Sequence, residues 1–194
     1  MQIERTIMGV RTLGPGNRMA IWVNGCRRNC PGCVSPSLKA FNIRNDVNIE
    51  RYFAAFDFSE VDGVTISGGE PFEQSRELDS LVTYLNEKGI EDILVYTGYT
   101  LEELRAKRSF CIDNVLSSIA VLIDGPYIIE QDRGMGNLKG SDNQKVHFLR
   151  EKYREVYENY QKSQREMQVF PMGASVVAVG IPDAGFITEF KKKG

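Results

Sequence analysis

The sequence predicts an α/β fold with a mainly parallel sheet, because short β-rich segments alternate with amphipathic helical segments over its first 125 residues. A second observation supports this class: several of the predicted strands run directly into glycine-containing loops. Right-handed crossovers between such strands give either an open doubly wound sheet or a fragment of a βα barrel. In both arrangements ligands bind at the carboxyl ends of the strands.

The apolar spacing and the turn signals predict the elements in order. A glycine at position 89 closes the second helix, and Thr100 with Glu103 fits a capping box that opens the third. The expected elements are a hairpin of residues 3–10 and 18–23, a helix around 49–56, a strand at 61–67, a helix around 78–85, a strand at 92–96, a helix from 101 and a strand at 118–123.

The last 45 residues are more highly charged than the rest and lack its alternation of strands and helices, so they predict an extension (150–194) beyond a core of residues 1–149. An apolar stripe on a charged segment predicts a helix to about Gln168, packed on the core or docked on a partner. Residues 175–190 predict a β-hairpin that turns at Pro182-Asp183-Ala184-Gly185, and the closing lysines predict a solvated tail. The stripe consists of Leu149, Tyr153, Val156 and Tyr160.

Composition argues against several classes of function. The chain of 194 residues has a net charge of −2, which gives no basic footprint for direct nucleic-acid binding. No apolar run is long enough to span a membrane, and the first residues lack a signal-peptide pattern. The sequence therefore predicts a cytoplasmic protein without a membrane or nucleic-acid partner.

Three of the four cysteines form the pattern Cys26-x3-Cys30-x2-Cys33 after a predicted strand. In a reducing compartment such a group predicts metal ligands rather than disulfides. A [4Fe-4S] cluster ordinarily takes four cysteines, so three leave one iron open to another ligand. A closed zinc site would need a second pair of cysteines, which the sequence does not offer. Cys111 has the apolar surroundings of an inert cysteine. The single histidine, His147, has no predicted role.

The segment Gly25-Cys26-Arg27-Arg28-Asn29-Cys30-Pro31-Gly32-Cys33 resembles the signature of the radical S-adenosylmethionine (SAM) superfamily. The segment Thr65-Ile66-Ser67-Gly68-Gly69-Glu70-Pro71 is similar to the GGE motif of that superfamily, which receives the amino group of SAM. The resemblance implies a [4Fe-4S] cluster on Cys26, Cys30 and Cys33, with SAM as the second cofactor.

Asp124-Gly125-Pro126-Tyr127 and Gly140-Ser141-Asp142-Asn143-Gln144 extend the resemblance to the activating proteins of anaerobic ribonucleotide reductase, which are glycyl-radical-enzyme activases. This resemblance covers residues 1 to about 149. It implies an incomplete, open TIM-like barrel, and reductive cleavage of SAM to a 5'-deoxyadenosyl radical that makes a glycyl radical on a partner enzyme.

The same resemblance implies a reduced flavodoxin or ferredoxin as electron donor, and no catalytic residue beyond the cluster and SAM. Position 32, often aromatic in the superfamily, is glycine, so the adenine contact falls to backbone or to another side chain. The residues implied to bind SAM are Gly32, Cys33, Val34, Ser67, Gly68, Gly69, Glu70, Thr97 and Asp124.

Two other functions remain open from the sequence. One is a radical SAM enzyme acting on a different peptide or a small molecule, although no second cysteine cluster accompanies the first. The other is a non-enzymatic iron-sulfur protein that carries electrons, for which a GGE motif has no use.

Overall fold

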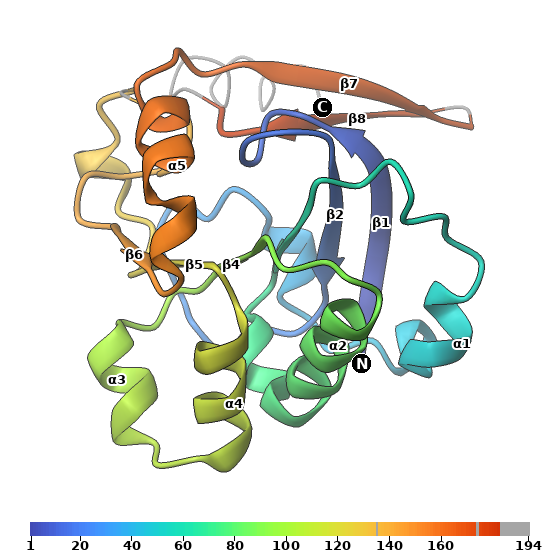
Figure 1. The fold of residues 1–194 in the computed structure, drawn as a ribbon. Coiled ribbons are helices and arrows are strands. Elements are labelled where there is room, and N and C mark those ends of the chain that lie inside the picture. Colours follow the sequence, from blue (N-terminus) through green and yellow to red (C-terminus); the bar gives the residue numbers. More distant parts are fainter. Residues whose placement is uncertain (135, 174, 183–194) are drawn as a thin grey trace.

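A computed structural model describes residues 1–134, 136–173 and 175–182. Its centre is a six-stranded sheet in which the strands lie in sequence order, from β1 to β6 (Figure 1). The strands are β1 (Ile3–Val10), β2 (Arg18–Val23), β3 (Gly63–Gly68), β4 (Ile93–Tyr96), β5 (Val121–Asp124) and β6 (Lys145–Phe148). The helices are α1 (Ile49–Phe53), α2 (Ser75–Glu87), α3 (Leu101–Ala106), α4 (Phe110–Ser118) and α5 (Arg154–Gln161).

The four middle strands are parallel, and the two outer strands are antiparallel to their neighbours. The predicted mainly parallel sheet is therefore confirmed. The strand order has no reversal, which distinguishes it from the doubly wound alternative. The carboxyl ends of β2, β3, β4 and β5 consequently lie at one edge of the sheet.

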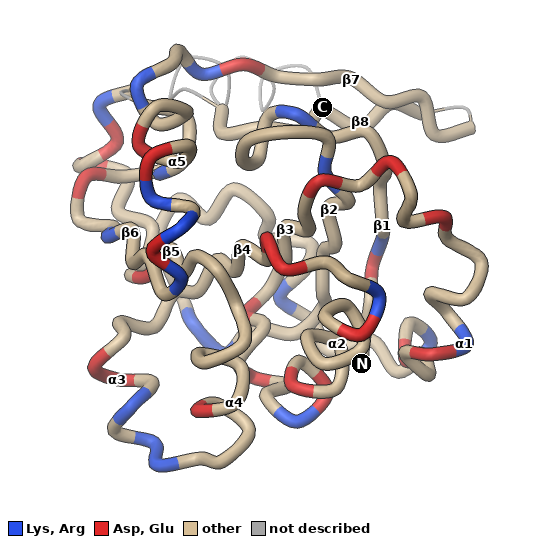
Figure 2. Tube along the Cα trace, in the orientation of Figure 1, with Lys and Arg blue, Asp and Glu red and all other residues tan. Residues whose placement is uncertain are grey.

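Alternate residues of each strand face opposite sides of the sheet, and the two sides are covered differently. Met19, Ile21, Ile66 and Val95 belong to the main core, which they share with apolar residues of α1, α2, α3 and α4. In Figure 1 the helices α2, α3 and α4 lie on one side of the sheet. The helix α5 lies on the other side, with a hairpin of β7 (Met167–Met172) and β8 (Ser175–Gly180). Figure 2 shows charges of both signs on α5 and the surface loops, whereas β3 and β4 carry none.

The capping box at the start of α3 is confirmed: the Thr100 side chain accepts from Glu103 N, and the Glu103 side chain accepts from Thr100 N. Gly89 has a φ of +83° after α2, as a helix-ending glycine requires. The strand β6 and the helix α4 were not predicted. The strand β6 alternates polar and apolar residues, but it is an edge strand of only four residues, which is too short for this pattern to predict it.

The prediction for the C-terminal segment was partly wrong. The helix ends at Gln161 rather than near Gln168, and the next residues form β7 (Met167–Met172). Its partner strand is β8 (Ser175–Gly180), so the hairpin occupies 167–180 instead of 175–190. The turn was expected at residues 182–185, and all of these except Pro182 lie outside the described residues.

Three residues of the predicted apolar stripe, Leu149, Tyr153 and Tyr160, pack against the core, but the fourth does not. Val156 is 45% exposed, whereas its neighbour Tyr157 is completely buried. Tyr157 faces inward because its hydroxyl finds an acceptor there in Asp92. No helix within the described residues is both long and apolar enough to cross a bilayer.

Candidate functional site

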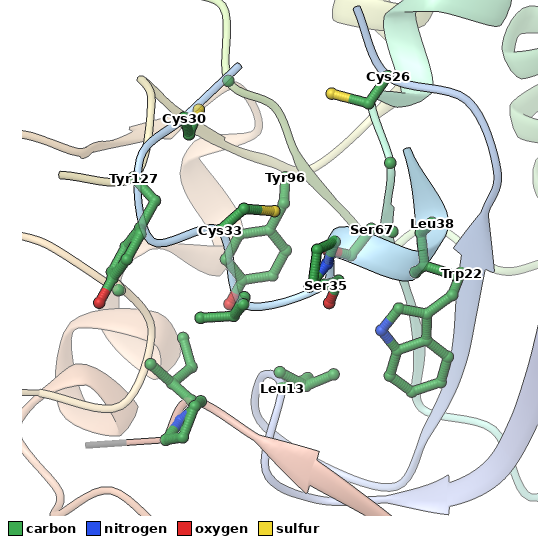
Figure 3. Close-up of a pocket in the computed structure, with 18 of the residues that line it drawn as sticks. Leu13, Trp22, Cys26, Cys30, Cys33, Ser35, Leu38, Ser67, Tyr96 and Tyr127 are labelled. Atoms are coloured by element: carbon green, nitrogen blue, oxygen red, sulfur yellow. The ribbon is translucent and has the colours of Figure 1, made fainter. Parts of the chain in front are cut away.

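A cavity of about 640 Å³ lies at the carboxyl ends of the parallel strands (Figure 3). The loops that follow β2, β3, β4 and β5 all contribute to it, as the strand order predicts. The predicted site residues that line it are Cys26, Cys30, Cys33, Val34, Ser67, Gly68, Gly69 and Thr97. The fold thus brings the cysteine motif and the Gly-Gly turn to one place.

The cysteine loop is anchored at its first cysteine. Gly25 N donates to Leu38 O and Cys26 N donates to Lys39 O, both at 2.9 Å. Cys33 N reaches Cys30 O at 3.3 Å and so closes a tight turn. Cys26 is therefore fixed to the backbone of Leu38 and Lys39, while the other two cysteines follow further along the loop.

The three cysteine sulfur atoms face the same cavity, but they are not arranged as a complete metal site. Within the described residues, no three side chains of His, Cys, Asp or Glu are close enough together to hold a metal ion. Burial raises the pKa of the Cys26 thiol, and the negative charge of Glu70 raises it further. Three soft sulfur donors on one short loop fit an iron-sulfur cluster, because cysteine thiolates are the ligands that such clusters take.

Gly68 and Gly69 dock the turn after β3 against the cysteine loop. Gly69 N donates to Val23 O at 2.7 Å, and Glu70 N donates to Gly25 O at 2.9 Å. A Cβ on Gly69 would lie 2.4 Å from Gly25 O, and a Cβ on Gly68 would lie 2.3 Å from Val23 N. Both glycines are therefore required by the close approach of the chain's own backbone.

Glu70 lies behind the cavity wall and is almost completely buried. Its carboxylate accepts from Phe72 N, Thr97 Oγ1 and Gly98 N at 3.1, 2.8 and 2.7 Å. Burial raises the pKa of Glu70, and these three donors and Arg28 oppose that rise. The carboxylate thus joins the loops after β3 and β4.

Asp124 and Gly32 are also set back from the cavity surface. Asp124 Oδ2 accepts from Leu101 N at 2.7 Å, which ties the end of β5 to the start of α3. His147 Nε2 lies 2.8 Å from the same oxygen, at an angle that makes no hydrogen bond. A Cβ on Gly32 would lie 3.1 Å from the side chain of Ile129.

Several residues of the cavity were missed from the sequence. The aromatic rings of Trp22 and Tyr127 line it beside Tyr96, and of these two missed residues only Tyr127 lies within a motif that pointed to the site. Arg28 packs over the ring of Tyr99 and against Gly98, where a Cβ would lie 2.7 Å from its Cδ. Residues of β8 complete one wall, and no motif in that strand indicated this.

Residues 12–147 match the model of a family described as a 4Fe-4S single cluster domain. The chain is 33% identical to the anaerobic ribonucleoside-triphosphate reductase-activating protein of Salmonella typhi over 145 residues, which span 71% of this chain and 92% of that protein. The proteins of the same name from Escherichia coli strain K12 and Enterobacteria phage T4 are 32% and 33% identical, over 71% and 69% of this chain and 92% and 85% of their own lengths.

The comparisons agree with the geometry, because the matched residues contain all three cysteines and every parallel strand of the sheet. The chain therefore belongs to the 4Fe-4S single cluster family and to the family of the anaerobic ribonucleoside-triphosphate reductase-activating proteins.

Proposed function

We propose that this protein is a radical SAM activating enzyme that generates a glycyl radical on an anaerobic ribonucleoside-triphosphate reductase. The observation that carries the proposal is that Cys26, Cys30 and Cys33 line one cavity with the Gly68-Gly69 turn, in a chain of this family. The name of the relatives supplies the partner.

In this proposal Cys26, Cys30 and Cys33 would hold a [4Fe-4S] cluster, and three protein ligands would leave the cluster open to SAM. With both bound, one electron from a reduced flavodoxin or ferredoxin would break the C5'–S bond of SAM to release methionine, and the resulting 5'-deoxyadenosyl radical would take a hydrogen atom from a glycine of the partner and leave as 5'-deoxyadenosine. The chain's own residues bind and orient the reactants and limit access of water.

The remaining site residues have supporting roles in the proposal. The Ser67-Gly68-Gly69 backbone and Thr97 face the SAM region, beside Cys33 and Val34. Glu70, Asp124 and Gly32 support that region from behind through their hydrogen bonds and close packing. Residues 1–149 form the catalytic core, arranged as a partial barrel, and residues 150–194 form an extension.

The test is anaerobic reconstitution with iron and sulfide, followed by an assay for 5'-deoxyadenosine from SAM and a strong reductant. Cys30→Ala should lose the cluster and the product together. Cys111→Ala is the matched control, because Cys111 belongs to α4 and does not line the cavity. It should retain full iron content and activity.

Addition of the partner reductase should then give a glycyl-radical doublet by electron paramagnetic resonance. A loaded wild-type cluster that forms no 5'-deoxyadenosine would support an electron carrier instead. Product formation without a radical on the reductase would point to another substrate.

A further inference from the structure

Arg165 lies between α5 and β7, outside the matched family domain, yet its guanidinium is committed to the loop after β5. Nε donates to Gly136 O and Nη2 donates to Lys139 O, each at 2.9 Å. Nη1 donates to Asp132 Oδ1 at 2.9 Å and to Pro182 O at 3.0 Å. The Arg165 and Asp132 side chains are only 7% and 1% exposed, so this ion pair is buried.

The loop that Arg165 holds fixes the ring of Tyr127. The Tyr127 hydroxyl donates to Asp132 Oδ2 at 3.1 Å, on the carboxylate whose other oxygen binds Arg165. The ring packs against Gly140, where a Cβ would lie 3.0 Å from ring carbon Cδ2. Arg165 Nη2 also lies 3.5 Å from Gly140 O. One arginine therefore supports both the hydroxyl and the ring of Tyr127.

Tyr127 lines the cavity on the side that carries Cys30 and Cys33 (Figure 3). Its ring is half-buried, so one part of it remains available to a ligand. Burial and the hydrogen bond to Asp132 raise the pKa of Tyr127 to about 12, which keeps the phenol neutral. A neutral ring held at a cavity wall is suited to stacking on a planar heterocycle.

Position 32 is unable to supply such a ring. Gly32 has a φ of +75°, a conformation that other residues rarely adopt, and Ile129 occupies the space beside its Cα. Tyr96 is a poorer candidate than Tyr127, because it is packed in the core cluster around Leu94 and its hydroxyl donates to Leu138 O.

We propose that Tyr127 contacts the adenine ring of SAM, and that Arg165 is a positioning residue that holds Tyr127 through Asp132 and Gly140. This inference rests on the proposed function. In this inference the segment after α5, which carries Arg165, contributes to SAM binding.

The test measures binding of radiolabelled SAM and of methionine to the anaerobically reconstituted protein, together with its iron content. Tyr127→Ala should weaken SAM binding by about tenfold or more, because the ring contact is lost. Methionine affinity and iron content should stay at wild-type values, which a general loss of structure would not allow. Tyr127→Phe keeps the ring and should bind SAM within about threefold of wild type.

Arg165→Met should weaken SAM binding in the same direction, and Arg165→Lys should fall between it and wild type because it keeps the charge without the planar fork. Arg154→Met is the control, since Arg154 is an exposed arginine of α5 whose partners are Glu151, Glu158 and the ring of Phe148, none of which lines the cavity. It should bind SAM normally.

Unchanged SAM affinity in Tyr127→Ala would overturn the adenine contact. If Tyr127→Ala binds SAM weakly while Arg165→Met binds SAM as wild type does, the positioning role of Arg165 is overturned. If the wild-type protein carries its cluster but binds no SAM, the proposed function itself fails, which distinguishes the two failures. Should Arg165→Met not fold, Arg165→Lys and Tyr127→Ala still decide the matter.

Discussion

The Tyr157 hydroxyl donates a 2.6 Å hydrogen bond to Asp92 Oδ1, and Asp92 Oδ2 lies 2.8 Å from Arg18 Nη1. This contact connects α5 to a buried ion pair at the amino ends of the parallel strands. Arg18 is fully buried, and Thr65 accepts from its Nε at 2.7 Å. Because every guanidinium nitrogen has a partner, the buried charge is compensated.

Replacement of Tyr157 by phenylalanine should lower the free energy of unfolding by about 1.5–3 kcal/mol, the usual worth of a hydrogen bond to a charged group. The ring stays in place, so the loss reports the hydroxyl alone. Urea unfolding, followed by circular dichroism, measures it. Tyr160→Phe is the matched control, because its partly exposed hydroxyl donates to the backbone oxygen of Arg11. Equal losses in both variants would contradict a special role for Asp92.

Arg18→Met should be more damaging, because it leaves the Asp92 carboxylate buried beside Tyr157 without its cation. Breaking a buried pair in this way costs about 3–5 kcal/mol. The same urea experiment applies, with Arg5→Met as a control on the neighbouring strand β1, because the Arg5 side chain is only partly buried and pairs with Glu4 next to it. A loss below 1 kcal/mol would show that the carboxylate finds water or a proton instead.

Much of the fold could be predicted because its parallel strands are short apolar runs that end at glycines. The capping box at Thr100 and the glycine at position 89 gave the helix boundaries in the same way. The C-terminal segment could not be predicted from apolar periodicity. Tyr157 is buried through a polar contact with Asp92, and a tyrosine among charged residues does not reveal which face of a helix turns inward.

The residues of the site were predicted as separate motifs, but the position and contacts of each one depend on tertiary structure. The cysteines and Gly68-Gly69 reach one cavity because they follow adjacent parallel strands. The resemblance implies that Glu70 binds SAM, and that role stays a prediction; no sequence signal indicated that its oxygens also accept from Thr97 Oγ1 and Gly98 N of the next loop. The pairing of Arg165 with Asp132 joins residues 33 apart, with no local signal.

Gly69→Ala should disrupt the contact between the turn after β3 and the cysteine loop. The new Cβ would lie 2.4 Å from Gly25 O and 3.0 Å from Leu38 O, which are backbone atoms with little freedom to yield. We expect a lower iron content after reconstitution and a loss of about 1–3 kcal/mol in unfolding free energy from overpacking. Iron analysis and urea unfolding measure the two effects.

Gly89→Ala separates this steric effect from ordinary glycine strain. Gly89 has a φ of +83°, but nothing lies within 4 Å of the position of its Cβ. This variant should lose about 1–2 kcal/mol through backbone strain and load iron as wild type does. If both glycine variants load iron normally, the docking of the turn is not needed for cluster assembly.

Glu70→Gln should destabilise the protein at neutral pH, because an amide cannot accept from all of Phe72 N, Thr97 Oγ1 and Gly98 N. One donor left without a partner costs about 1–3 kcal/mol, partly offset by removal of a buried charge.

The pH dependence of this variant follows from the direction of the Glu70 shift. Burial raises the pKa of Glu70 above its usual 4.5, so the folded protein holds this proton more tightly than the unfolded chain does. The contribution of Glu70 to stability is therefore largest below pH 4.5 and declines as the pH rises through the folded-state pKa. Urea unfolding of both proteins between pH 5 and pH 8 should show the advantage of wild type over Glu70→Gln growing as the pH falls. An advantage that shrinks on acidification would mean that the hydrogen bonds to Thr97 and Gly98 outweigh burial and lower the pKa.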